Sequence, residues 1–163
     1  MKYTKEFINA LGRWEGRRNE VYICSAGYST IGIGHKLTKS ELSSGKILIG
    51  NEKVYWREGL TDEQIDFLAL QDLRKCCLAL QKYVTVELSQ CQMEALASFI
   101  FNVGITAFKN STLLSVLNAG HYDKVPKQLQ RWVYASGKVS QGLINRRAYE
   151  ISWWHRQAQV LDN

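Results

Sequence analysis

Residues 13–37 carry most of the information about how this chain folds and acts: they read Arg-Trp-Glu-Gly-Arg-Arg-Asn-Glu-Val-Tyr-Ile-Cys-Ser-Ala-Gly-Tyr-Ser-Thr-Ile-Gly-Ile-Gly-His-Lys-Leu. Glu15 ends an amphipathic helical stretch, Cys24 follows after eight intervening residues, and Thr30 follows after five more. A carboxylate at a helix end that faces a second reactive side chain is the layout a glycosidase needs, because two groups must flank one scissile bond.

The segment after this helix is predicted to be extended and rich in turns, with Gly27 at the turn. Tyr28–Ile33 alternates enough to predict a strand. Gly32 and Gly34 leave room for another group close to the backbone. The sequence therefore predicts a glycine-rich hairpin opposite the helix end.

Four blocks of the sequence resemble one family. Residues 15–35, with Glu15, Cys24 and Thr30 followed by Ile-Gly-Ile-Gly-His, are similar to the catalytic signature of phage-type lysozymes, the endolysins of glycoside hydrolase family 24. The other blocks, in family order, are residues 88–104, residues 107–114, and residues 142–147 with Glu150. Because they span almost the whole chain, they are more specific than any single motif.

Cys24 is the departure from the usual pattern, because most of the family carries Asp there and a minority carries Cys. By this resemblance Glu15 is the general acid, and Thr30 holds the attacking water or a sugar oxygen. A Cys24 thiolate either activates water, giving inversion, or attacks the anomeric carbon, giving retention. The route of the carboxylate relatives favours water activation. In a simpler interpretation Cys24 only packs, and the protein is weakly active or inactive.

The resemblance also implies substrate-binding and supporting residues. The substrate-binding residues are Phe101, Asn102, Ser111 and Gln128. The supporting residues are a structural His35, paired with Asp72, and Arg146, which contacts the catalytic glutamate in relatives. Phe101 is also interpretable as a core residue, and Arg146 as a surface helix charge.

Composition sets the broad class of protein. The chain has 163 residues, with 45% hydrophobic and 22% charged residues, typical of a globular protein. The N-terminus has no continuous apolar region, so we expect no signal peptide, and no apolar run is long enough for stable membrane insertion. The net charge of +6 favours an anionic partner. The four cysteines lack metal-ligand spacing, so no metal or cofactor is expected.

Capping signals and apolar periodicity predict the remaining elements. Thr61–Gln64 opens a long helix that runs to about Tyr83, and Ser89–Gln92 opens an apolar helix that forms the core of a helical lobe. Further helices are predicted at Lys5–Trp14, Ser111–Asn118, Tyr122–Ala135, Ser140–Arg147 and Ile151–Val160. Ser40–Gly59 is predicted to be an irregular loop with a short strand around Lys53–Trp56.

We therefore predict an α+β, lysozyme-like, mostly helical fold, formed as a single domain over residues 1–163. A small hairpin lobe (about 15–60) is joined by the long helix to a larger helical lobe (about 61–163 plus the N-terminal helix), with the site in the cleft between them. The resemblance implies a monomeric muramidase that cleaves the β-1,4 bond between N-acetylmuramic acid and N-acetylglucosamine in peptidoglycan. Such an enzyme is made in the host cytoplasm, is released by a holin, and acts on the wall in the periplasm to lyse the host. Some relatives carry an N-terminal signal-arrest anchor, which is not expected here, and no nucleic-acid partner is expected.

Three alternatives remain. A lytic transglycosylase would cut the same bond with one acidic glutamate and leave a 1,6-anhydro product. A cysteine peptidase or amidase would use Cys24 as nucleophile, with His35, His121 or His155 as base, but would leave Glu15 and Thr30 unexplained. A wall-binding module without activity is supported only by the basic charge.

Overall fold

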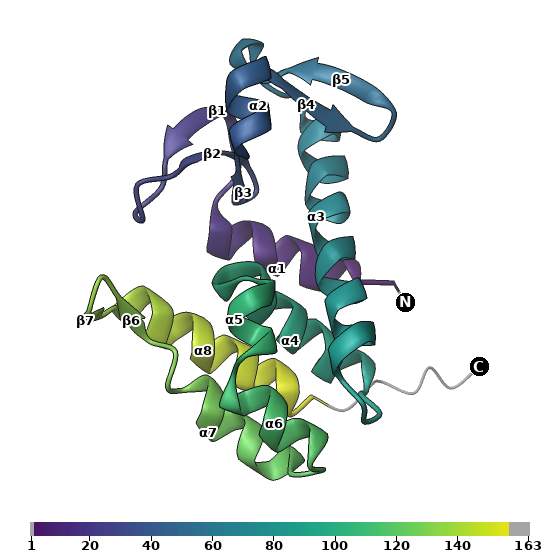
Figure 1. Cartoon of the computed structure of the whole chain (residues 1–163), viewed down its shortest axis with the longest axis vertical. Helices are drawn as coiled ribbons and strands as arrows, with labels where there is room; N and C mark the ends of the chain where they lie inside the picture. The colour runs from purple at the N-terminus through teal and green to yellow at the C-terminus, as the bar shows by residue number, and fades with distance from the viewer. Residues whose placement is uncertain (1, 157–163) are drawn as a thin grey trace. The chain divides into compact units, whose positions relative to one another are not determined.

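The computed structural model describes residues 2–156. Two compact units are distinguished, residues 2–75 and residues 76–156, and the long helix α3 (Asp62–Tyr83) contributes to both (Figure 1). Helices predominate, with short antiparallel strand pairs, so the α+β prediction is confirmed. The predicted single domain, with a lobe boundary near residue 60, stays a prediction.

The first unit begins with α1 (Lys5–Glu15), whose apolar face buries Phe7 and Leu11. The Thr4 side chain caps α1 by accepting a hydrogen bond from the Phe7 backbone N–H, and Gly16, at a φ of 76°, ends it. A three-stranded antiparallel sheet follows, in the order β1-β2-β3. Its strands are β1 (Arg18–Ile23), β2 (Ser29–Gly32) and β3 (His35–Lys36). The predicted helix and hairpin are therefore confirmed.

Residues 39–58 form regular secondary structure. The prediction of an irregular loop is therefore wrong for most of this segment. They form α2 (Lys39–Ser44), the antiparallel pair β4 (Lys46–Ile49) and β5 (Glu52–Tyr55), and a 3₁₀ turn, η1 (Trp56–Glu58). Gly50, at a φ of 61°, begins the two-residue turn between the strands, where a positive φ matches the strand twist. Of this segment, the sequence predicted only the strand near Lys53.

Helix α3 begins as predicted. The Thr61 hydroxyl accepts from the Gln64 backbone N–H (3.2 Å), and the Gln64 side-chain oxygen accepts from the Thr61 N–H (2.9 Å), which is a complete capping box. Further along, Gln71 donates to the Leu48 carbonyl (3.0 Å) and so ties the β4–β5 pair to α3.

The second unit is built around α4 (Gln90–Val103), which is buried on all sides from Met93 to Ile100 and packs against α8 (Gln141–Trp154). Its capping box at Ser89 and Gln92 is present, which confirms the predicted helix start. The other elements are α5 (Ile105–Lys109), α6 (Thr112–Asn118), η2 (Tyr122–Lys124), α7 (Val125–Leu129), β6 (Tyr134–Ala135) and β7 (Lys138–Val139).

The predicted helix over Tyr122–Ala135 is wrong in its second half. Helix α7 ends at Leu129, and the chain enters the short β6–β7 hairpin. Ser136 and Gly137 both have positive φ values, 51° and 75°, as a tight hairpin turn requires. The two predicted C-terminal helices are one helix, α8, and the predicted end at Val160 lies outside the described residues.

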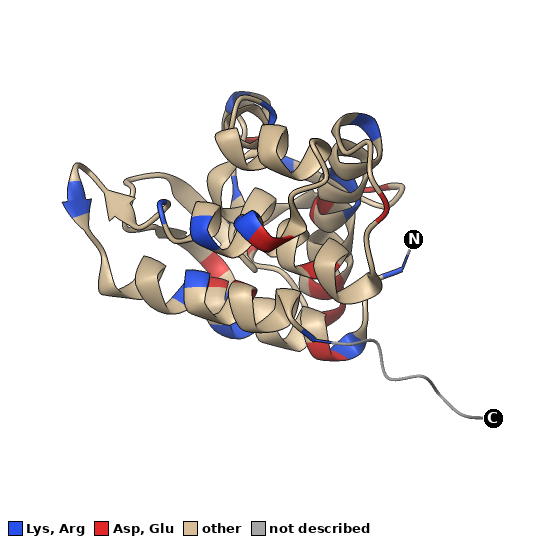
Figure 2. Ribbon diagram, turned by 90° about the horizontal axis from the view of Figure 1, so that it is seen from below, with Lys and Arg blue, Asp and Glu red and all other residues tan. Residues whose placement is uncertain are grey.

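Basic and acidic residues are both distributed over many elements of the described chain (Figure 2). Within residues 2–156, no helix combines the length and apolar character needed to cross a membrane.

Candidate active site

Glu15 lies at the C-terminal end of α1, directly against the glycine-rich hairpin. A Cβ atom built on Gly34 would lie 2.7 Å from Glu15 Oε2, closer than non-bonded atoms approach one another. Gly34 also has a φ of 65°, a conformation that side chains disfavour. The close approach predicted at this glycine is therefore confirmed, and the group that occupies the space is the Glu15 carboxylate.

Cys24 and Thr30 are brought together by one carbonyl group. The Tyr28 carbonyl oxygen accepts hydrogen bonds from the Cys24 backbone N–H and from the Thr30 hydroxyl, each at 2.9 Å. The turn between them is closed by the Gly27 N–H, which donates to the Cys24 carbonyl at 2.8 Å. Cys24 is half-buried, whereas Thr30 is only 2% exposed.

Polar groups around Cys24 favour its ionised form. Burial raises the pKa of the thiol, but the backbone N–H groups of Tyr28 and Ala26, the neighbouring Thr30 hydroxyl and the charge of Lys36 lower it. The pKa of Cys24 therefore lies below its ordinary value. Because a thiolate is both a base and a nucleophile, these contacts favour the reactive form of the side chain.

Tyr22 is a component of the site that the sequence did not identify. Its hydroxyl donates to the Glu15 backbone carbonyl at 3.4 Å, and it pairs with Thr30 across the sheet. Burial raises the pKa of Tyr22, and negative charges on Glu15 and on Cys24 raise it further, against the charge of Arg18. The phenol therefore lies near both groups. Strand alternation could have indicated this residue, since Tyr22 of β1 lies two residues before Cys24.

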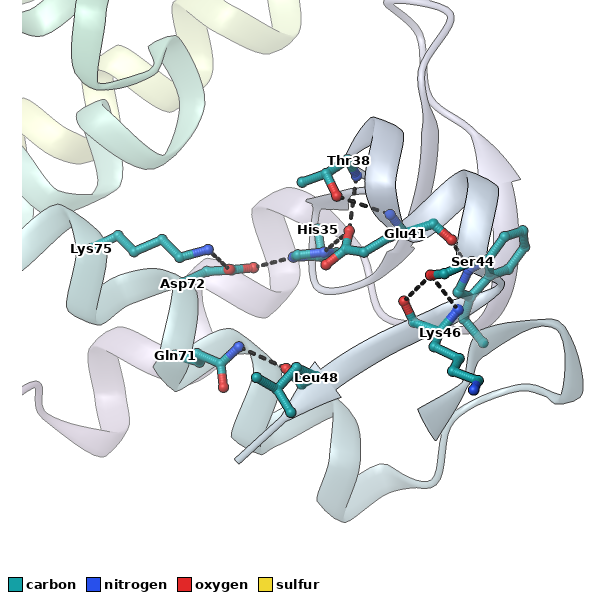
Figure 3. Close-up of polar contacts among 10 residues, drawn as sticks. His35, Thr38, Glu41, Ser44, Lys46, Leu48, Gln71, Asp72 and Lys75 are labelled. Atoms are coloured by element: carbon teal, nitrogen blue, oxygen red, sulfur yellow. Dashed lines mark hydrogen bonds and ion pairs between the residues drawn. The ribbon is translucent and has the colours of Figure 1, made fainter. Parts of the chain in front are cut away.

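His35 is held between two carboxylates (Figure 3). Its Nδ1 lies 2.6 Å from Asp72 Oδ2 on α3, which confirms the predicted pairing. The sequence missed the second carboxylate, Glu41 of α2, whose Oε2 lies 3.1 Å from Nε2. The same Glu41 oxygen accepts from the Thr38 N–H at 2.8 Å in the capping box of α2, and Lys75 pairs with Asp72 at 3.3 Å.

The two carboxylates determine the charge of this histidine. Burial would lower the pKa of His35, but the hydrogen bonds and negative charges of Asp72 and Glu41 outweigh it, and the pKa is raised. The charged cluster joins β3, α2 and α3, and so holds the hairpin that carries Gly34 against the rest of its unit.

The predicted substrate-binding residues belong to the second unit. Phe101 and Asn102 are half-buried in the last turn of α4, and Gln128 is half-buried on α7. Ser111 is buried and caps α6, since its hydroxyl accepts from the Leu114 backbone N–H at 3.1 Å. The same hydroxyl donates to the Phe108 carbonyl at 2.6 Å.

Arg146 is part of a buried ionic cluster rather than a surface helix charge. It is 4% exposed, donates to the Ser98 carbonyl at 3.0 Å and pairs with Glu150 at 3.3 Å. Arg147 also pairs with Glu150, at 3.2 Å, and donates a short hydrogen bond to Asn102. Burial raises the pKa of Glu150, against the charges of Arg147 and Arg146. The cluster orients Asn102, and the sequence did not indicate this role for Arg147.

The comparisons with known proteins agree with this geometry. Residues 12–150 match the family described as "Phage lysozyme".

The chain belongs to the phage lysozyme family.

Within this family, the endolysin of Salmonella phage P22 is 34% identical over 152 residues, which are 92% of this chain and 95% of the relative. The endolysin of Bacillus phage B103 is 32% identical over 92% of this chain. That alignment covers 52% of the relative, so the chain spans about half the length of the B103 protein.

Among solved structures, the muramidase domain of SpmX from Asticaccaulis excentricus is 29% identical, with a TM-score of 0.76. The likeness covers 96% of this chain and 99% of that one. The lysozyme-like fold and the phage lysozyme family predicted from the sequence are therefore confirmed. For this phage lysozyme family member, the roles of the individual site residues stay predictions.

Proposed function

We propose that this chain is a muramidase that hydrolyses the β-1,4 bond between N-acetylmuramic acid and N-acetylglucosamine in peptidoglycan. Membership of the phage lysozyme family supports the class of reaction, and the likeness to a muramidase domain supports the bond. The observation that carries the proposal is the position of the Glu15 carboxylate against Gly34, in the same hairpin whose Tyr28 carbonyl joins Cys24 and Thr30. An acid and a second anionic group near each other are what hydrolysis of a glycosidic bond requires.

In this mechanism Glu15 donates a proton to the glycosidic oxygen as its bond to the anomeric carbon breaks. A water molecule attacks that carbon from the opposite face, and the Cys24 thiolate accepts a proton from the water. The products are a free reducing end, a Cys24 thiol and a Glu15 carboxylate. Transfer of the proton from the thiol through solvent to Glu15 restores the starting state. The anomeric configuration is inverted.

Thr30 orients the attacking water in this scheme. The Thr30 hydroxyl donates its proton to the Tyr28 carbonyl. The lone pairs of the Thr30 oxygen can therefore accept a hydrogen bond from a water that is also hydrogen-bonded to Cys24. The hydroxyl group itself is also close enough to Cys24 to lower the pKa of the thiol. Both observations support a position for Thr30 between the thiol and the water.

We further propose that Phe101, Asn102, Ser111 and Gln128 contribute to saccharide binding, and that His35 and Arg146 support the site. The contact between Arg147 and Asn102 supports this role for Asn102, because a fixed amide can form directed hydrogen bonds with a sugar. Ser111 already forms two capping hydrogen bonds, so its hydroxyl offers only its remaining acceptor capacity to a ligand.

The proposed setting is host lysis by a phage. The enzyme acts as a monomer on the wall in the periplasm, after release from the cytoplasm with the help of a holin. Relatives named endolysin support the lytic role, and a relative from Escherichia phage Mu is named SAR-endolysin. The net charge of +6 favours association with peptidoglycan, whose peptides carry carboxylates.

The test is the release of reducing ends from purified peptidoglycan. Glu15→Gln keeps the size of the side chain but cannot donate the proton, so turnover should fall by at least about a hundredfold. Iodoacetamide should abolish release by the unmodified protein, and Cys24→Ser should already be inactive before alkylation. Full activity of Glu15→Gln would refute the assignment of the acid.

The products separate the alternatives. Free reducing ends indicate hydrolysis, whereas 1,6-anhydro ends without them would identify a lytic transglycosylase. Binding to the wall with no cleavage product of either kind would identify a binding protein. Release that survives both alkylation and Cys24→Ser would leave Cys24 as a packing residue.

A further inference from the structure

The residues around Cys24 form two rows on one face of the β1-β2-β3 sheet. Thr30 pairs with Tyr22 of β1 on one side and with Lys36 of β3 on the other. Directly opposed residues of antiparallel strands project from the same face, so these three side chains form the first row. Cys24 and Tyr28 lie just beyond the ends of β1 and β2, where the Cys24 N–H donates to the Tyr28 carbonyl at 2.9 Å, so the two residues continue the ladder as a second row.

Tyr28 holds the charged end of Lys36 beside this second row. The Lys36 ammonium lies 4.7 Å from the centroid of the Tyr28 ring, a cation–π contact. The Tyr28 carbonyl accepts a hydrogen bond from the Cys24 N–H at 2.9 Å, and the Tyr28 backbone N–H lowers the pKa of the Cys24 thiol. A single residue therefore contacts both the ammonium and the cysteine.

Two other cations of this hairpin region, Arg17 and Arg18, contact groups other than Cys24. Arg17 hydrogen-bonds Asp66 at 2.6 Å and lies 3.5 Å from Asp62, both on α3. The Arg18 guanidinium lies over the Tyr22 ring, 5.2 Å from its centroid. Among the lysine and arginine residues of this hairpin, Lys36 is thus the cation whose charge acts on the thiol.

We propose that Lys36, held over the Tyr28 ring, is the counter-charge that keeps Cys24 ionised and able to accept a proton from water. This inference rests on the proposed function, in which Cys24 acts on the attacking water. Lys36 is a positioning residue, because it acts on the substrate only through the thiol.

The test is the pH dependence of alkylation of Cys24 by iodoacetamide, resolved from the other cysteines by peptide mass spectrometry. In Lys36→Met the midpoint of the profile should rise by about half a pH unit, as expected for loss of one partly screened unit charge. At pH 7 the reaction should slow about twofold, because fewer thiolates form but each is more nucleophilic. Lys36→Arg should restore the midpoint.

Two further variants and one change of conditions make the test specific. Lys53→Met removes an exposed strand lysine of β5, and its midpoint should equal that of the unmodified protein. Tyr28→Leu leaves the charge but removes the ring that holds it, so its midpoint should rise by less than that of Lys36→Met. In about 1 M salt the difference between Lys36→Met and the unmodified protein should shrink, because the Debye length falls to about 3 Å.

An unchanged midpoint in Lys36→Met would overturn the proposal, and so would an equal rise in Lys53→Met. The alkylation measurement needs no substrate, so its result is independent of turnover. A raised midpoint in Lys36→Met with no reducing-end release by the unmodified protein would support the Lys36–Cys24 pair and refute the proposed hydrolysis.

Discussion

Replacing Asp72 by Asn removes one of the two carboxylates that hold His35, and should destabilise the protein strongly at acidic pH. His35 is 7% exposed and the Asp72 side chain 14%, so the interaction between them is shielded from water. Breaking a buried ion pair costs about 3–5 kcal/mol. Glu41 remains 3.1 Å from His35, and the Asn oxygen can still accept a hydrogen bond, so we expect a loss of about 2–3 kcal/mol.

The loss should depend on pH in a defined direction. The pKa of His35 in the folded protein is raised above the value of about 6.5 expected for an unfolded chain. The folded state therefore binds the proton more tightly, and the ion pair contributes its full stability below about pH 6.5. That contribution is lost as the pH rises through the raised pKa, so the effect of Asp72→Asn should shrink at alkaline pH.

Urea denaturation at pH 5.5 and at pH 9, followed by circular dichroism, measures both predictions. Asp66→Asn is the matched control, because Asp66 lies on the same helix and pairs with Arg17 at 2.6 Å but has a 59% exposed side chain. Its loss should stay below about 1 kcal/mol at both pH values. A loss for Asp72→Asn that is the same at both pH values, or no larger than that of the control, would refute the argument.

Two further variants test the second unit. Ser89→Ala removes the side chain that accepts from the Gln92 N–H at 3.1 Å, and should cost about 1 kcal/mol in thermal unfolding, while Ser89→Asn should retain most of the stability. Arg147→Met should cost about 3–5 kcal/mol in urea denaturation, because it leaves the fully buried Glu150 with one fewer cation. The double variant Arg147→Met/Glu150→Gln should recover part of the lost free energy of unfolding, because it also removes the buried negative charge. A double variant as unstable as Arg147→Met alone would contradict this explanation.

Local signals in the sequence predicted most helix starts correctly. The capping boxes at Thr61 and Ser89 each depend on contacts between residues three apart, which the sequence specifies directly. The box formed by Thr38 and Glu41 has the same spacing, so the sequence carries the signal for α2 within a segment that is predicted to be a loop. Ser136 and Gly137 are a turn signal, and the residues before them form β6, so the helix predicted over Tyr122–Ala135 is too long.

The sequence by itself determined the family and the starts of the capped helices, because the Glu15, Cys24 and Thr30 spacing and the helix caps are local patterns. Only the tertiary structure decided which distant groups meet. The register of the sheet places Lys36 beside Thr30 and, through Tyr28, near Cys24.

The partners of the buried charges are also decided by the tertiary structure. Glu41 and Asp72 reach His35 from different helices, and Arg146 meets Ser98 from 48 residues away. A buried charge must find a partner to offset its lost hydration, and packing rather than local spacing selects that partner.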